Sequence, residues 1–434
     1  MSSSNFPLQN KGIFKSLPTF SPDIKDLTAI VTGANGISGF HTMRVLLESP
    51  QRWRKVWAAS RRPPPEEMMA LLPAGQRARV EHIALDFLSS PEDIARLLKE
   101  KSVTADVVFF YSYAQPKQAS AETMVEVNSA LLRNFINALP QAGIAPSRFL
   151  LQTGAKTYGV HLGPARTPHV ESDPRITKFE RIFYYPQEDI LWQYCKDHRK
   201  TKWNVITPAW IIGAVNNAAM NALRPLAVYA AVQAHKKEPL HFPGDYDSWL
   251  GVNTHSSAKL TGYLSEWAVL EEKCANQTFN AIDDSLLPNN RLWPELARWY
   301  GAEAGSDPEL DESKLTTIDP GEVPTPLDYG PPLKPRFSFT LSQWAGKAEN
   351  QAAWKEIMNE KGVTHNLFED IKANFAFGEA VAWARVLQIS SNKARHFGWT
   401  GHVDTLESLF LAYGEFQKIG MLPPMVVEKA NPLI

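Results

Sequence analysis

One stretch near the amino end, Leu27-Thr-Ala-Ile-Val-Thr-Gly-Ala-Asn-Gly-Ile-Ser-Gly39, constrains the fold of this chain more than any other. Its first half is short, apolar and β-branched, which predicts a strand buried on both faces of a sheet. Three glycines follow at regular spacing, Gly33, Gly36 and Gly39, and residues 40–47 then predict a helix. A strand, a glycine turn and a helix in that order predict a dinucleotide-binding corner. Glycines there let backbone N–H groups approach a pyrophosphate at the positive end of the helix.

The rest of the first half repeats strands and helices. Further strands are predicted at 56–60, 80–85, 105–111, 148–152 and 203–207. Helical patterns separate several of them, which predicts an α/β fold built on a Rossmann-type, doubly wound parallel sheet. Ligands bind such sheets at the carboxyl ends of the strands, so Ser112 and Tyr113 are expected beside the cofactor. Asn35 and Ile37, in the glycine corner, are expected to line the cofactor as well.

The chain has 434 residues, which is too long for one small core. We expect a flexible arm over residues 1–22, a dinucleotide-binding domain over 23–215, and a smaller, mainly helical substrate-binding lobe over 216–434. A strand at 278–281 is expected to return to the sheet. Residues 307–335 hold seven prolines and are expected to form a long surface loop.

The strand at 56–60 runs into Arg61 and Arg62, where an NAD-specific fold would place a carboxylate. Guanidinium groups bind a 2′-phosphate through charge-assisted hydrogen bonds, so the pair favours NADPH over NADH. Alternatively, the two arginines could simply lie in a solvent-exposed loop that follows the strand. Asp86 and Phe87 end the next strand, and an acid at that point commonly meets the adenine amino group.

Composition excludes several classes of function. The 45 basic residues are balanced by 46 acidic residues, so no basic surplus points to nucleic acid. Two cysteines make no disulfide framework, and we find no secretion signal and no membrane span, so a cytoplasmic protein is expected. The sequence contains no His-x-x-x-His pair with an acid between the two histidines, so it predicts no metal site.

A dinucleotide fold followed by a helical lobe suggests a reductase of the extended short-chain dehydrogenase type. Such enzymes normally keep a Tyr-x-x-x-Lys pair on one helix, where the tyrosine stabilises or protonates the substrate oxygen. The only such spacing here joins Tyr113 to Lys117 across a proline that would break the helix, so we reject it. Lys156, just after the strand at 148–152, and Tyr184, at the start of a helical segment, form an alternative pair.

At these residues the chain resembles the plant progesterone 5β-reductase/iridoid synthase family, an atypical branch of the short-chain dehydrogenases. The family's Leu-Gln-Thr-Gly-x-Lys-x-Tyr segment is matched by Leu151-Gln-Thr-Gly-Ala-Lys-Thr-Tyr158. Its Asn-Phe-Tyr-x-x-x-Glu-Asp segment is matched by Ile182-Phe-Tyr-Tyr-Pro-Gln-Glu-Asp189, without the asparagine. Further similar segments lie at 108–114, 228–231, 242–244, 278–280 and 393–398, so the resemblance covers nearly the whole chain.

The resemblance implies an NADPH-dependent 1,4-reductase of activated C=C bonds in enones or enals. Hydride arrives at the β-carbon, and Tyr184, aided by Lys156, stabilises the enolate. The enolate could also close a ring, so reductive cyclisation is a further outcome. By correspondence, the residues expected to contact NADPH are Gly36, Ile37, Arg61, Arg62, Asp86, Ser112, Tyr113, Gln152, Lys156, Tyr184, Ile211, Ala218, Ala219 and Met220.

Departures from the family surround the expected pocket. Tyr113, Thr157 and Thr207 stand where the family has Trp, His and Arg. We therefore expect a small hydrophobic polyketide or terpenoid enone rather than the plant substrates, and leave a homodimer open. Two other functions remain open: a ketone reductase or redox-neutral isomerase or cyclase, and a non-catalytic NADP(H)-sensing regulator. Tyr184 and Tyr185 could also be ordinary packing aromatics, and Lys156 a surface lysine.

Overall fold

The computed structural model describes residues 7–433, except residues 117, 178–180, 217–220, 306–307, 310, 320, 322–328, 330–332 and 383–386. A seven-stranded sheet forms the centre of the first unit, with strand order β12-β8-β7-β6-β3-β4-β5 and every neighbouring pair parallel. The strands are β3 (Leu27–Thr32), β4 (Trp53–Ser60), β5 (Val80–Ala84), β6 (Val107–Phe110), β7 (Arg148–Gln152), β8 (Lys202–Pro208) and β12 (Gln277–Ala281). The Rossmann-type sheet expected from the sequence is confirmed. The strand expected at 278–281 is β12, at the edge beside β8.

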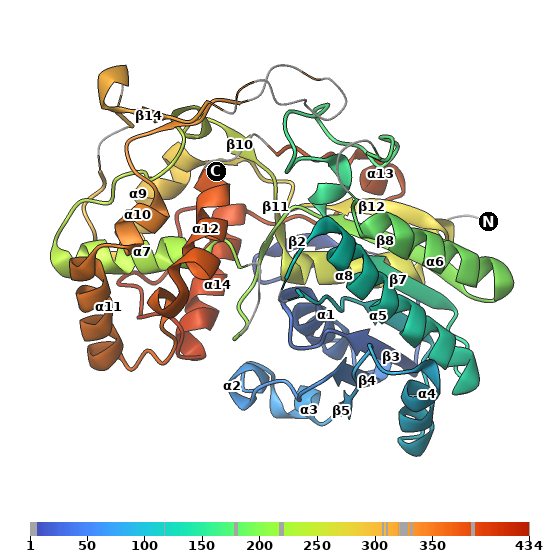
Figure 1. Ribbon diagram of the computed structural model, residues 1–434. Helices are drawn as coiled ribbons and strands as arrows, with labels where there is room; N and C mark the ends of the chain where they lie inside the picture. Colours follow the sequence, from blue (N-terminus) through green and yellow to red (C-terminus); the bar gives the residue numbers. More distant parts are fainter. Residues whose placement is uncertain are drawn as a thin grey trace.

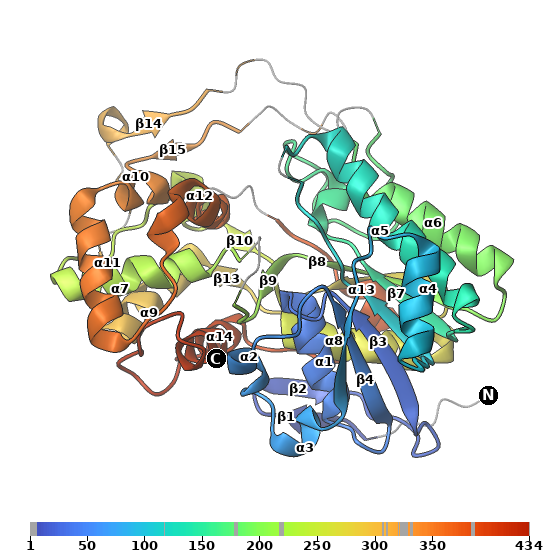
Figure 2. The ribbon, with the colours of Figure 1, turned by 60° about the horizontal axis from the view of Figure 1, so that its bottom comes forward.

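Helices cover both faces of this sheet (Figure 1, Figure 2). One face carries α1 (Ile37–Leu47) and α8 (Ala258–Leu270), and the other carries α4 (Pro91–Glu100), α5 (Ala121–Gln141) and α6 (Tyr184–Asp197). Successive side chains of a strand point to opposite faces. In β3, Ala29 and Val31 therefore join the core under α1 and α8, whereas Ile30 joins the core under α4 to α6. This explains the uninterrupted apolar run of that strand.

The second unit is a helical lobe, at the left of Figure 1, with a core of its own. Its helices are α7 (Arg224–Lys236), α9 (Asn289–Tyr300), α10 (Leu341–Ala345), α11 (Ala348–Lys361), α12 (Ile371–Ala382) and α14 (Thr405–Lys418). Trp299 and Trp354 are completely buried in this core. Helix α7 belongs to the lobe, α8 packs on the sheet, and α9 belongs to the lobe again. The chain therefore crosses between the two units more than once.

Shorter elements connect these parts. They are α2 (Glu66–Met69), α3 (Ala74–Arg77), β9 (Trp210–Ile212) paired with β11 (His255–Ser257), β10 (Val252–Asn253) paired with β13 (Leu287–Pro288), β14 (Thr316–Thr317) paired with β15 (Arg336–Phe337), and α13 (Asn392–His396). Strands β14 and β15 lie within or beside the Pro-rich segment. Among the described residues, none of the helices is both long and apolar enough to span a membrane.

A single helix suggested by the pattern at 341–358 is two helices in the structure. Thr340 caps α10 through a capping box with Gln343, and the helix ends at Gly346. The side chain of Asn350 in α11 donates a hydrogen bond of 2.8 Å to the carbonyl of Trp344. That contact fixes the corner between the two helices, and apolar spacing alone does not reveal it.

A buried ion pair joins the two units. The guanidinium of Arg44 in α1 donates to both carboxylate oxygens of Glu415 in α14, at 2.6 and 2.9 Å. Both side chains are largely shielded from solvent, 12% and 9% exposed. A buried carboxylate without its partner is strongly destabilising, so this pair fixes where the lobe meets the start of the Rossmann unit.

The expectation of a flexible arm over residues 1–22 is wrong for much of that segment. Strands β1 (Gln9–Lys11) and β2 (Phe14–Leu17) form an antiparallel hairpin. Phe14 and Leu17 are 3% and 1% exposed and belong to the core beside α8. The segment is polar on average, but the first and last residues of β2 are buried, and that burial holds the hairpin in place.

This hairpin gives a stability test. Replacing Phe14 by Ala should lower the free energy of unfolding by about 3–5 kcal/mol, the usual cost of removing a buried aromatic ring. The exposed neighbour Lys15 provides the matched control, and Lys15→Ala should change stability by less than about 0.5 kcal/mol. Urea unfolding followed by circular dichroism measures both. Equal stability of the two variants would show that the hairpin does not contribute to the folded core.

Candidate active site

The glycine corner is shaped by the absence of side chains. Gly33 has φ +61°, and a Cβ there would lie 2.8 Å from the carbonyl oxygen of Tyr111. A Cβ on Gly39 would lie 2.3 Å from the carbonyl oxygen of Gly33. Helix α1 begins after Gly36, which supplies no side-chain cap, so the first N–H groups of the helix remain available to an anion. The corner therefore fits the pyrophosphate of a dinucleotide.

Next to this corner, Asn35 fixes the loop that carries the arginine pair. Its amide donates hydrogen bonds of 2.9 and 3.3 Å to the carbonyls of Arg62 and Pro63. Ser60, the last residue of β4, donates to the same Arg62 carbonyl at 2.7 Å. Both arginine side chains are exposed, and no acid of the described chain pairs with either. They are thus free to receive a phosphate.

The end of β5 carries the next expected contacts. Asp86 is exposed, and its carboxylate accepts a hydrogen bond of 3.0 Å from the N–H of Leu88. Phe87 is buried, and its ring packs edge-on against Phe110 and Phe135. Asp86 therefore lies where a ligand could reach it, whereas Phe87 contributes mainly to the core.

The loop after β6 is held from two sides. The hydroxyl of Thr32, at the end of β3, accepts hydrogen bonds from the N–H groups of Tyr111 and Ser112 at 3.0 and 3.2 Å. Asn128 of α5, fully buried, accepts from the N–H of Ala114 at 2.9 Å and donates to its carbonyl at 3.0 Å. Ser112 and Tyr113 therefore lie on a fixed loop at the carboxyl edge of the sheet. Sequence reasoning gave Asn128 no such role.

Gln152, at the end of β7, faces the start of α1. Its amide donates a hydrogen bond of 2.8 Å to the hydroxyl of Ser38, while its buried Oε1 has no protein partner. Buried polar atoms are nearly always hydrogen-bonded, so this oxygen fits a donor on a bound molecule such as a ribose hydroxyl. Ile211 lies half-buried in β9. Ala218, Ala219 and Met220 lie outside the described residues.

The expected catalytic tyrosine approaches the expected lysine segment. A Cβ on Gly154 would lie 2.7 Å from the hydroxyl of Tyr184, so only a glycine leaves room for that hydroxyl. The centroids of the Tyr184 and Phe183 rings lie 4.3 Å apart, and those of the Phe183 and Tyr113 rings lie 5.8 Å apart. Burial raises the pKa of the Tyr184 phenol, and Tyr113 raises it further. The hydroxyl is therefore a protonated donor at neutral pH.

Lys156 lies two residues after Gly154, in the 3₁₀ turn η1 (Ala155–Tyr158). Its side chain is exposed, and it makes no hydrogen bond or ion pair with any described residue. The structure thus brings the two backbone segments together, but it does not join the ammonium of Lys156 to the hydroxyl of Tyr184.

The neighbouring Tyr185 holds these two segments together. Its hydroxyl donates to the carbonyl of Thr157 at 2.7 Å and accepts from the N–H of Ile176 at 2.9 Å. Tyr185 therefore ties the first turn of α6 to the turn that carries Lys156. Both tyrosines pack in the cluster of Ile176 and Ile182, but they differ in their hydroxyl groups: that of Tyr185 has two hydrogen-bond partners, whereas that of Tyr184 has none among the described residues. The family motif assigned the catalytic role to Tyr184, but nothing in the sequence indicated that Tyr185 binds the turn of Lys156.

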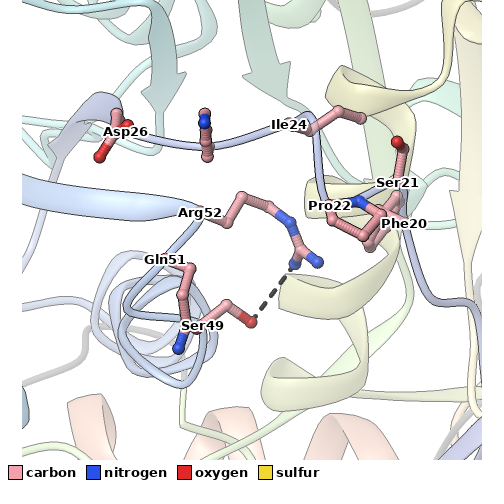
Figure 3. A pocket seen from close by; sticks show the side chains of 9 residues that line it. Phe20, Ser21, Pro22, Ile24, Asp26, Ser49, Gln51 and Arg52 are labelled. Atoms are coloured by element: carbon pink, nitrogen blue, oxygen red, sulfur yellow. Dashed lines mark hydrogen bonds between the residues drawn. The ribbon is translucent and has the colours of Figure 1, made fainter.

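A separate hollow lies away from this site (Figure 3). It is lined by residues 20–22 and 24–26 and by the turn before β4, at the amino ends of the strands. Its Arg52 already bonds Ser49 and Glu266 and stacks over the ring of Phe20. Ligands of doubly wound sheets bind at the opposite, carboxyl edge, so we assign this hollow no role.

The described part of the chain contains no group of three or more His, Cys, Asp or Glu side chains that could hold a metal ion.

Comparison with known proteins decides the family. Residues 29–324 match the PRISE-like Rossmann-fold domain family. The chain belongs to this PRISE-like family. It is also 30% identical over 402 residues to the short chain dehydrogenase gsfE of Penicillium aethiopicum, covering 91% of this chain and 99% of that relative. Membership makes the chain an oxidoreductase of a class that uses a nicotinamide cofactor, as the sequence predicted.

Other relatives agree with this assignment, and one solved structure shares the fold. The chain is 27% identical to (S)-8-oxocitronellyl enol synthase CYC2 of Camptotheca acuminata and 25% identical to the 3-oxo-Delta(4,5)-steroid 5-beta-reductase of Arabidopsis thaliana, each over 91% of this chain and 93% of the relative. The terminal R domain of the myxalamid PKS-NRPS pathway shares the fold, with a TM-score of 0.56, 12% identity and 89% of each chain covered.

The contact between Tyr184 and Gly154 gives a test of the site. Gly154→Ala should push the Tyr184 hydroxyl away and lower kcat about 10²–10³-fold, the usual effect of losing one such donor. Gly154 has φ −174°, which any residue adopts, so backbone strain should add little. Gly75→Ala is the matched control, since a Cβ there meets nothing within 4 Å. Unchanged turnover in Gly154→Ala would refute the importance of this contact.

Proposed function

We propose that the protein reduces the activated C=C bond of an enone or enal with NADPH. The observation that carries the proposal is the approach of the Tyr184 hydroxyl to Gly154, beside Lys156 and at the carboxyl edge of the sheet. A protonated phenol and a turn that carries an amine support the proposal, because they lie at the edge where the glycine corner would hold a dinucleotide. The bound nicotinamide would supply a hydride.

The roles of the protein groups follow from charge. Hydride addition to the β-carbon of an enone builds negative charge on the carbonyl oxygen, and a preorganised donor there lowers the barrier. Burial keeps the Tyr184 phenol protonated, so it can donate to that oxygen without first taking up a proton. Lys156 is exposed to the same edge, and its positive charge would favour the developing anion.

The names of relatives support this chemistry. The Arabidopsis relative is named for reduction of a steroid whose double bond lies beside a 3-oxo group, and the Camptotheca relative is named as an enol synthase. Both names fit a site that stabilises an enol or enolate. The proposal extends to reductive cyclisation of a polyketide or terpenoid intermediate, because the enolate formed by reduction could attack a second group of the same substrate and close a ring.

Substrate panels test the reaction. Purified protein with NADPH should consume cofactor with 2-cyclohexen-1-one and not with cyclohexanone, and Tyr184→Phe should lower kcat about 10²–10³-fold with little change in NADPH affinity. Turnover of ketones alone would favour the ketone reductase. Tight NADPH binding without turnover on a broad panel would favour the sensor.

The choice of cofactor has its own test. Arg61→Ala and Arg62→Ala should each weaken NADPH binding about 10- to 100-fold, because each removes a charged hydrogen bond to the 2′-phosphate, and leave NADH binding unchanged. Arg54, exposed at the other end of β4, is the control for loss of one positive charge. Equal losses for NADPH and NADH, measured by fluorescence titration, would count against the assignment.

A further inference from the structure

A second polar site lies in the lobe, at the start of α7. A hollow there is lined by Asn221, Arg224, Leu367, Asn374 and Phe377, among others. Helix α7 and helix α12 pack against each other at this place and lie side by side in Figure 1. The hollow therefore opens between two helices of the substrate-binding lobe and not within the sheet.

Arg224 is half-buried, and it lacks the carboxylate partner that a shielded guanidinium normally has. Its Nη2 donates only to the carbonyls of His365 and Met421, each at 3.3 Å, and its Nε is buried without any partner. No carboxylate of the described residues forms an ion pair with it. A buried charge without a counter-charge is costly, so proteins pair it or use it to bind an anion. Burial lowers the pKa of Arg224 to about 9, with no acid acting against it.

The hollow adjoins the active site through two aromatic rings. Phe377 lines the hollow, and the centroid of its ring lies 5.7 Å from that of Trp210 in β9. Trp210 and Ala155, the residue before Lys156, both pack against the cluster of Tyr158, Ile282, Leu387 and Ile389. The indole N–H of Trp210 is also buried without a partner. Phe377 thus contacts Trp210 and shares the hollow with Arg224, and each of these two residues has a buried N–H group without a partner.

We propose that Arg224, with the amides of Asn221 and Asn374, forms a subsite for an anionic group, a carboxylate or a phosphate, of a small molecule bound between the two units. This rests on the proposed function only in naming the substrate, which would be an enone that carries a carboxylate away from its reacting end. The other source of the same chemistry is a phosphate of the dinucleotide, because Asn221 also donates to the carbonyl of Gly213, which lies against Ile37 of α1.

Equilibrium binding separates these sources without relying on turnover. The probes are 3-oxocyclohexenyl carboxylic acids of increasing chain length and their methyl esters, titrated calorimetrically into the NADP⁺-loaded protein. For the wild type we expect one acid to bind more tightly than its ester. Arg224→Gln should weaken that acid about 10- to 100-fold, as loss of a charged hydrogen bond does, and leave the ester unchanged. A loss of NADP⁺ affinity with unchanged acid binding would assign the subsite to the cofactor's phosphate.

Controls keep the proposal falsifiable if the variant is unstable. Arg224→Lys retains the charge and should keep part of the preference for the acid, while Arg291→Gln removes an exposed charge from α9 and should change nothing. The ratio of acid to ester affinity within one variant is insensitive to partial misfolding. An Arg224→Gln protein that binds acid, ester and NADP⁺ as the wild type does, or loses acid and ester equally, would overturn the subsite. Either result could occur with the reductase activity intact, so the two proposals fail separately.

Discussion

The candidate active site depends on the contact between the Tyr184 hydroxyl and a residue that has no side chain. Gly154 allows the phenol to lie against the backbone of the turn that carries Lys156, where any larger residue would displace it. Because the phenol comes from the start of α6 and the lysine from the turn after β7, the two groups need not share a helix. Tyr185 makes this arrangement stable by binding the carbonyl of Thr157.

The cofactor corner and the lobe are positioned by the same helix. Helix α1 begins at the glycine turn, contacts the end of β7 through Ser38, and binds the lobe through Arg44. A movement of the lobe would therefore shift α1 and, with it, the pyrophosphate corner and the contact to Gln152. The lobe adds polar groups of its own, above all Arg224, which the sequence alone did not distinguish from any other arginine.

Local patterns predicted the sheet well, because a strand buried on both faces and a glycine turn are encoded within a dozen residues. The pair Lys156 and Tyr184 could be proposed from motifs. Its geometry could not, because the contact to Gly154 joins segments thirty residues apart. The hairpin at residues 9–17 was missed for the same reason: Phe14 is buried by Tyr263, far along the chain. Asn35 stays a predicted cofactor contact, but the sequence did not predict that its amide also holds the loop of Arg62.

The destination of the hydride tests the account most directly. The protein would be incubated with 2-cyclohexen-1-one and NADPH deuterated at both C4 positions, and the product analysed by ²H NMR. A phenol that stabilises an enolate predicts deuterium on the β-carbon of a saturated ketone. Deuterium on the carbinol carbon of an allylic alcohol would contradict it, because the Tyr184 hydroxyl would then serve carbonyl reduction instead.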